Sequence, residues 1–236
     1  VPATTSTPSA ALASVVSRLT AERSWDALGL AEWLLPTVGA MGMGKPTAVQ
    51  AAVIPPILAG EDVIACSQTG SGKTAAFALP LLSKLSEDPY GVFAVVLTPG
   101  RELAHQIGEQ FKALGAPMRV RVVVTTGGTD FVRQSAELAQ LPHIIVATPG
   151  RLAALITGGA TCPRLSSVAC VVLDEADRLM DASMAPDMAT ILGALPSPDT
   201  GRQTLLFSAT ITKNLKRIEA LALRTPFKWE ATPEVC

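Results

Sequence analysis

A glycine-rich segment follows an apolar run and precedes a predicted helix: Ser67-Gln68-Thr69-Gly70-Ser71-Gly72-Lys73-Thr74. Glycine allows backbone N–H groups to approach phosphate oxygens closely, and the start of a helix favours negative charge. Lys73 would reach the outer phosphates of a nucleotide, and the Thr74 hydroxyl would bind Mg²⁺. Because Ser67 stands where the strict pattern has glycine, a Gly/Ser turn with an unrelated lysine is the alternative.

Two adjacent carboxylates, Asp174 and Glu175, follow the apolar run 171–173. A carboxylate at the end of a buried strand, opposite a phosphate loop, is suited to anchor Mg²⁺ through water, which is the role predicted for Asp174. Glu175 would lie on the other side of the strand axis and polarise a water for attack on the terminal phosphorus. By itself, the pair is equally consistent with a helix N-cap.

Two arginines, Arg101 and Arg151, each follow a Pro-Gly pair and are predicted to open a helix. Free N–H groups at a helix start, beside an arginine, can hold a phosphodiester backbone, and Gly128 would let a nucleic-acid strand approach closely. Each arginine alone is more commonly a solvated surface residue, but two matching turns favour backbone binding. The turns have no accompanying ladder of aromatic residues, so base stacking is not indicated.

The elements that must position these residues are visible as short apolar runs without strict alternation, which is typical of strands buried on both faces. We predict strands at 63–66, 92–97, 120–124, 143–147, 168–173 and 203–207. Helices are predicted at 25–42, 48–58 (bent or interrupted at Pro55-Pro56), 74–86, 101–114, 130–141, 151–157 and 186–195. The alternation predicts an α/β fold with a doubly wound parallel sheet flanked by helices.

Polar and glycine-rich segments follow nearly every predicted strand, and the carboxyl ends of parallel strands form the ligand-binding edge of such sheets. We therefore expect the phosphate loop, the acidic pair and both Pro-Gly-Arg turns on one rim. The central geometric prediction is that Lys73 faces Asp174 and Glu175 across neighbouring strand ends.

The chain has 236 residues, of which 48% are hydrophobic, and a formal net charge of −1. This composition excludes a disordered chain, and any nucleic-acid surface must be local. The four cysteines form no CxxC pair, which favours reduced thiols in an intracellular protein over zinc or disulfides. No apolar run approaches the ~18 residues that a membrane helix needs, so no membrane partner is expected. Residues 1–22 are interpreted as a tail or linker rather than a transit peptide.

Seven segments in order make the chain similar to the first RecA-like domain of DEAD-box RNA helicases. They are Gly42-Met43-Gly44-Lys45-Pro46-Thr47-Ala48-Val49-Gln50, the phosphate loop, Pro99-Gly100-Arg101-Glu102-Leu103, Gly127-Gly128, Thr148-Pro149-Gly150-Arg151, Asp174-Glu175-Ala176-Asp177 and Ser208-Ala209-Thr210. The resemblance implies a single P-loop domain of RecA-like fold over 23–231, which binds ATP and Mg²⁺. Residues 232–236 would begin a linker to a second RecA-like domain.

The resemblance also implies roles for individual residues. Lys73, Asp174 and Glu175 would be catalytic, with Thr74 and Asp174 at the metal. The nucleotide would contact Trp25, Met43, Lys45, Gln50 and the whole phosphate loop, with Gln50 reading the adenine edge. RNA sugar–phosphate would be gripped, without sequence readout, by Pro99, Gly100, Arg101, Gly127, Gly128, Thr148, Pro149, Gly150 and Arg151. Asp177, Ser208 and Thr210 would couple ATP binding to closure against the second domain.

Three residues depart from the family pattern: Met43 replaces an aromatic that stacks on adenine, Gly100 replaces a threonine of the first RNA turn, and Ser67 replaces an alanine. The sequence also contains no His-Arg-x-Gly-Arg segment, so the isolated chain, half of a longer monomeric protein, is expected to bind ATP with negligible turnover. A nucleotide-switched RNA- or protein-binding module is the alternative function. Segments 84–91 and 226–231 resemble nucleolar helicases of small-subunit ribosome assembly, which implies assembly-factor partners and a nuclear or nucleolar location.

Overall fold

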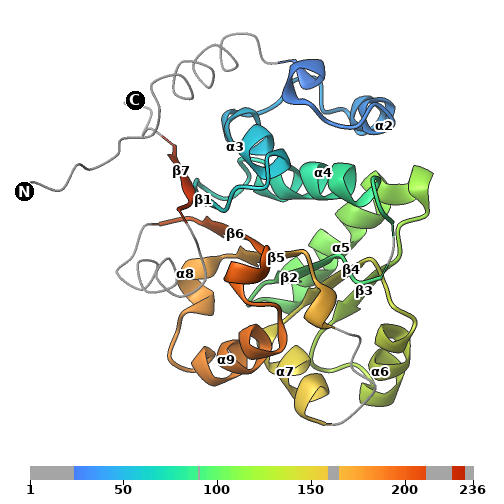
Figure 1. Cartoon of the computed structure of the whole chain (residues 1–236), viewed down its shortest axis with the longest axis vertical. Coiled ribbons are helices and arrows are strands. Elements are labelled where there is room, and N and C mark those ends of the chain that lie inside the picture. Colours follow the sequence, from blue (N-terminus) through green and yellow to red (C-terminus); the bar gives the residue numbers. More distant parts are fainter. Residues whose placement is uncertain (1–23, 90, 159–164, 211–224, 232–236) are drawn as a thin grey trace, which may run out of the picture.

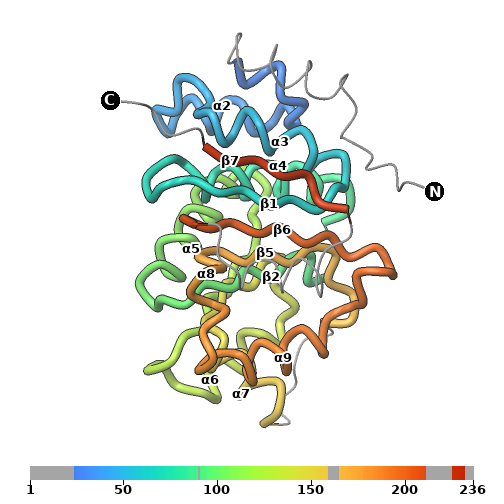
Figure 2. Tube along the Cα trace, turned by 90° about the vertical axis from the view of Figure 1, so that its left-hand side faces the viewer, coloured from blue at the N-terminus to red at the C-terminus, as the bar shows by residue number. Residues whose placement is uncertain are grey.

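A parallel sheet of seven strands forms the centre of the structure, a computed structural model that describes residues 24–89, 91–158, 165–210 and 225–231. The strands are β1 (Val63–Cys66), β2 (Ala94–Leu97), β3 (Val122–Thr125), β4 (Ile144–Ala147), β5 (Cys170–Asp174), β6 (Gln203–Ser208) and β7 (Phe227–Glu230). Their order is β3-β4-β2-β5-β6-β1-β7, and each adjacent pair is parallel. Figure 2 shows β7 beside β1, followed by β6 and β5.

Strand residues alternate between two hydrophobic cores, one on each face of the sheet. In β2, Ala94 and Val96 belong to one core, whereas Val95 and Leu97 belong to the other. Every residue of β1, β2, β4, β5 and β6 is buried, which confirms the expectation of strands covered on both faces. The six predicted strands are all present, and each observed strand begins at the predicted residue or at most two residues after it.

Helices cover both faces of the sheet, so the predicted doubly wound architecture is confirmed (Figure 1). The first core is covered by the 3₁₀ turn η1 (Trp25–Leu28), α2 (Leu34–Ala40), α3 (Ala48–Leu58), α4 (Lys73–Leu85) and α5 (Arg101–Gly115). The second is covered by α6 (Phe131–Ala139), α7 (Pro149–Thr157), α8 (Ala176–Leu179) and α9 (Ala185–Ala194). Shorter 3₁₀ turns are η2 (Ala116–Met118), η3 (Leu165–Ser167) and η4 (Pro198–Thr200).

One predicted helix was wrong, one predicted interruption is absent, and one strand was missed. The predicted helix at 25–42 is two pieces, because Gly29 adopts a left-handed φ of 77° and ends η1. Helix α3 continues through Pro55 and Pro56, since the Pro55 carbonyl still accepts a hydrogen bond from the Ala59 N–H. Strand β7 was not predicted as a strand, because only alternate residues of this edge strand face the core.

Within the part of the chain that the structure describes, no helix has the length and hydropathy needed to cross a membrane. The predicted tail at 1–22 and the predicted linker at 232–236 lie outside the described residues.

Helix α5, which carries one of the predicted RNA-binding arginines, packs closely on β3 at Gly108. A Cβ added there would lie 2.4 Å from Cγ2 of Val124, whose branched side chain has little freedom on a strand. A Cβ added at Gly193, in α9, would meet nothing within 4 Å. The close approach of α5 to β3 therefore depends on a glycine.

We predict that Gly108→Ala lowers the free energy of unfolding by about 1–3 kcal/mol, because the added methyl overpacks the contact. Gly193→Ala is the matched control, and we expect it to be neutral or stabilising by up to about 1 kcal/mol. Urea unfolding of the two variants measures both effects. Equal stabilities would contradict the tight α5–β3 contact.

Candidate active site

The predicted phosphate loop lies between the end of β1 and the start of α4, as expected. Gly70 and Gly72 have φ of 80° and 92°, in the left-handed region that favours glycine. The Ser67 and Ser71 hydroxyls are 2.8 Å apart, and the Lys73 ammonium donates to the carbonyls of Ser67 and Gln68. The loop therefore closes around its own lysine. The first residues of α4, Lys73, Thr74 and Ala75, line a cavity.

That cavity, called here the phosphate cavity after the predicted phosphate loop, has a volume of about 470 Å³ and is lined by residues from both sides of the rim. It is lined by Thr69, Gly70, Gly72, Lys73, Thr74, Ala75, Leu103, Gln106, Gln110, Asp174, Glu175, Asp177, Arg178 and Ala209. Lys73 and the acidic pair thus face one cavity, as predicted. The expectation of neighbouring strand ends was wrong, because β6 lies between β1 and β5.

Asp174 is a carboxylate with unusual electrostatics, since the residue is only 3% exposed. Burial raises its pKa to about 6, although the nearby Lys73 ammonium opposes the shift. Among the described residues, its only hydrogen bond is from the Glu175 N–H to Oδ1, at 3.1 Å. A desolvated carboxylate with one oxygen that accepts no hydrogen bond from the described residues, in a cavity that Thr74 also lines, suits a hard cation such as Mg²⁺.

Glu175 was expected on the opposite side of the strand from Asp174, and this expectation was wrong. Its backbone has a left-handed φ of 53°, so the chain leaves the strand direction and α8 begins at the next residue. Glu175 lines the same cavity as Asp174, and its carboxylate accepts a hydrogen bond from Arg178 Nη1 at 2.7 Å. Its side chain is 25% exposed, so water can reach this carboxylate.

The segment before α3 is fastened to the phosphate loop through Gln50. Its Oε1 accepts from the Thr47 N–H at 2.8 Å, which completes a capping box, and its Nε2 donates to the Gly72 carbonyl at 3.1 Å. Trp25 holds the same segment from the other end, because its Nε1 donates to the Met43 carbonyl at 2.7 Å. Met43 packs against the first core, whereas Lys45 is exposed.

The three residues predicted to couple nucleotide binding to domain closure lie together. The Ser208 hydroxyl donates to the Thr210 carbonyl at 2.8 Å and accepts from the Thr210 N–H at 3.2 Å. The Thr210 hydroxyl reaches Asp177 Oδ2 at 3.4 Å, which links the end of β6 to α8. Asp177 also lines the phosphate cavity, so the link extends to the site itself.

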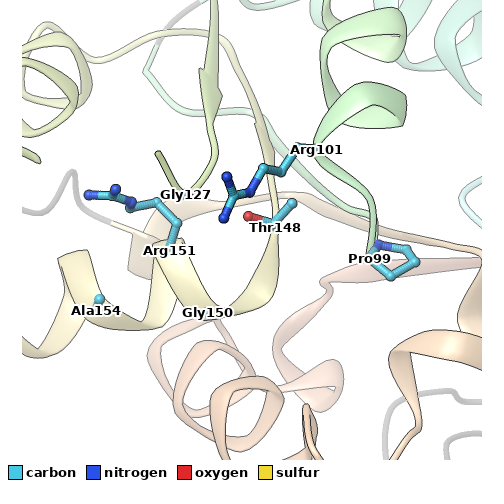
Figure 3. A pocket seen from close by; sticks show the side chains of 7 residues that line it. All are labelled: Pro99, Arg101, Gly127, Thr148, Gly150, Arg151 and Ala154. Carbon is cyan, nitrogen blue, oxygen red and sulfur yellow. The ribbon is translucent and has the colours of Figure 1, made fainter. Parts of the chain in front are cut away.

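A second cavity, of about 360 Å³, holds the predicted RNA-binding turns and is called here the arginine groove (Figure 3). It is lined by Pro99, Arg101, Gly127, Thr148, Gly150, Arg151 and Ala154. The Arg101 guanidinium lies against the two glycines, because Cβ atoms added at Gly127 and Gly128 would be 3.0 and 2.8 Å from its nitrogens. Gly100, Gly128 and Pro149 do not line the groove directly.

The two Pro-Gly-Arg turns were expected to match, and they do not. Arg101 is the first residue of α5, after Gly100 at the N-cap. Helix α7 already begins at Pro149, which needs no N–H partner at that position, so Arg151 is its third residue. The Arg151 guanidinium points away from Arg101 and donates to the Thr129 carbonyl at 2.9 Å (Figure 3).

A doubly wound parallel sheet with a glycine-rich loop between its first strand and a helix defines the chain as a P-loop domain of the RecA-like type. A family profile described as DEAD/DEAH box helicase matches residues 47–218. The chain therefore belongs to the DEAD/DEAH box helicase family.

Curated relatives and a solved structure agree with this assignment. The chain is 53% identical over 209 residues to a probable ATP-dependent RNA helicase, ddx49, of Dictyostelium discoideum, covering 89% of this chain and 41% of that protein. It is 53% identical over 205 residues to the ATP-dependent RNA helicase dbp8 of Aspergillus terreus, covering 85% of this chain and 39% of that protein. The chain thus spans about two fifths of these relatives.

The crystal structure of a DEAD box protein from the hyperthermophile Methanococcus jannaschii has the same fold. Its TM-score is 0.82 at 32% sequence identity, over 89% of this chain and 56% of that one.

Sequence reasoning missed the contribution of α5 and α8 to the phosphate cavity. Leu103, Gln106 and Gln110 are spaced by three and four residues, so they share one face of α5 and line the cavity together. That spacing was a usable signal once α5 was placed beside α4. No comparable pattern in the sequence places Arg178 in the cavity, because the direction of α8 depends on the left-handed backbone of Glu175.

We predict that Gly72→Ala destabilises the domain more than Gly70→Ala. Both glycines have left-handed backbones, so alanine costs about 1–3 kcal/mol of strain at either position. Only at Gly72 would the new Cβ also lie 2.5 Å from Gln50 Nε2; at Gly70 it would meet nothing within 4 Å. Urea unfolding should show a difference in unfolding free energy between the two variants, and this gap should close when both are measured in a Gln50→Ala background. A gap that survives Gln50→Ala would contradict the clash.

Proposed function

We propose that this chain is the ATP-binding half of an ATP-dependent RNA helicase that unwinds or remodels RNA. The observation that carries the proposal is the shared cavity of the Lys73 loop and the acidic pair Asp174 and Glu175. The cavity has a cation and the N–H groups of a helix start on one side and two carboxylates on the other. This arrangement is suited to holding a triphosphate and activating water beside it.

Each residue of the cavity has a physically separate task in this proposal. The Lys73 ammonium exchanges its two carbonyl partners for phosphate oxygens, which carry full negative charge and bind it more strongly. Thr74 and Asp174 would hold Mg²⁺, which when bound neutralises phosphate charge. Glu175 orients and deprotonates the attacking water. Gln50 has one N–H and further acceptor capacity left for an adenine edge.

RNA is proposed to bind in the arginine groove through its sugar–phosphate backbone. The groove offers two guanidinium groups and the N-terminus of α7, all of which favour phosphate, and close backbone approach at Gly127. The net charge of −1 gives no general affinity for RNA, so binding depends on this local site. Domain closure would be signalled through Asp177, Ser208 and Thr210, onto a second RecA-like domain.

The remaining expectations stay predictions. A role in small-subunit ribosome assembly, with assembly-factor partners and a nuclear or nucleolar location, rests on the resemblance of segments 84–91 and 226–231. The names of the curated relatives, ATP-dependent RNA helicases, support the general activity of the whole protein.

We predict that Lys73→Ala weakens ATP binding by about 10- to 100-fold, because a charged group that donates to phosphate contributes about 1.5–3 kcal/mol. Lys112→Ala is the matched control, since this exposed lysine of α5 pairs, among the residues that the structure describes, only with Glu109. Equilibrium titration with a fluorescent ATP analogue measures both. Wild-type affinity in Lys73→Ala would refute the phosphate-loop assignment.

We predict that the isolated chain hydrolyses ATP at no more than a few turnovers per minute, with or without RNA. The sequence contains no His-Arg-x-Gly-Arg segment, and an arginine finger contributes about 10³–10⁵ in rate. Addition of a matching second RecA-like domain should restore RNA-stimulated hydrolysis, which Glu175→Gln abolishes and Glu109→Gln leaves intact. Fast turnover by the isolated chain would overturn the first expectation. Absence of rescue would favour a nucleotide-switched binding module instead.

A further inference from the structure

The Arg151 side chain is held by two neutral groups at the start of α6. Its Nη2 donates to the Thr129 carbonyl at 2.9 Å, and its Cζ lies 5.7 Å from the centroid of the Phe131 ring. A cation at this distance from an aromatic face is attracted by the quadrupole of the ring. Among the described residues, Arg151 forms no salt bridge.

The Phe131 ring is itself fixed in place. Phe131 is the first residue of α6, and the N-cap residue Asp130 accepts a hydrogen bond from the Arg133 N–H at 2.8 Å. The ring packs against the second hydrophobic core, and a Cβ added at Gly158 would lie 3.0 Å from its Cζ. The ring is therefore packed between the second core and Gly158, and the Arg151 guanidinium lies over it.

We propose that Phe131 is a positioning residue for Arg151, holding its guanidinium at the edge of the arginine groove for contact with the RNA backbone. The inference rests on the proposed RNA-binding function of that groove. A carboxylate partner would hold the guanidinium but cancel its charge, whereas a ring and a carbonyl leave the positive charge available to phosphate. One N–H is donated to Thr129, and the planar fork retains others for phosphate oxygens.

Arg101 provides an internal comparison, because it is held differently. Its guanidinium rests on the backbone of Gly127 and Gly128, and no aromatic ring contact to it occurs within the described residues. Phe131 should therefore affect RNA binding through Arg151 and not through Arg101.

The test is equilibrium binding of a fluorescent single-stranded RNA to the whole chain over a series of salt concentrations. Arg151→Ala should weaken binding and reduce the slope of log affinity against log salt by about 1. Phe131→Leu should weaken binding about two- to five-fold, which corresponds to a cation–π contact. In the double variant, Phe131→Leu should add nothing to Arg151→Ala, whereas it should add in full to Arg101→Ala.

A second variant separates ring electrostatics from packing. Replacing Phe131 with pentafluorophenylalanine keeps the shape of the ring but reverses the charge distribution on its face. We expect the fluorinated protein to bind RNA about as weakly as Phe131→Leu, and thermal unfolding of the same protein checks that the ring still packs beside Gly158.

The outcomes distinguish the two proposals. Failure of the wild-type chain to bind RNA at low salt would overturn the RNA site and the role of Phe131 together. Weaker binding by Arg151→Ala, with wild-type binding by the fluorinated protein, would overturn the role of Phe131 alone. If the losses of binding from Phe131→Leu and Arg151→Ala add in full in the double variant, Phe131 acts through general packing. That result would also overturn its role as a positioning residue.

Discussion

Burial of parallel strands on both faces of the sheet is the constraint on which the site depends. Side chains along β1, β2, β5 and β6 are buried among hydrophobic groups, so charged residues can be accommodated only where the strands end. Because all strands run in one direction, their carboxyl ends share one rim. Lys73 and Asp174 thus meet in one cavity although β6 separates their strands.

Three cations on this rim, Lys73, Arg101 and Arg151, are held by uncharged partners. Backbone carbonyls hold Lys73, the glycine backbone supports Arg101, and a carbonyl with an aromatic ring supports Arg151. None of these partners carries a charge, so each cation keeps its attraction for an anionic ligand. Asp174 shows the converse case: burial raises the pKa of its carboxyl group, and a bound cation would lower that pKa again.

The fold was predictable because its signals are local in sequence, and much of the site geometry was not. Apolar runs placed the strands, and the Ser67-to-Thr74 segment placed the loop, since both follow from residue types at fixed spacing. The hydrogen bond from Trp25 to the Met43 carbonyl and the contact of Phe131 with Arg151 join separate elements, so no local pattern indicates them. The left-handed backbone of Glu175 was equally hidden, because non-glycine residues seldom adopt it.

The two Pro-Gly-Arg strings show why identical local sequences can position a side chain differently. Successive helical residues are rotated by about 100°, so Arg101, at the first position of its helix, and Arg151, at the third, differ by about 200° around their helix axes. The difference arises because Gly100 remains outside α5 whereas Pro149 enters α7. One guanidinium therefore lies over Gly127 and Gly128, and the other reaches across to α6. A groove with two arginines on separate supports can present charge at two separated points along a phosphate backbone, which a matched pair on one surface would not do.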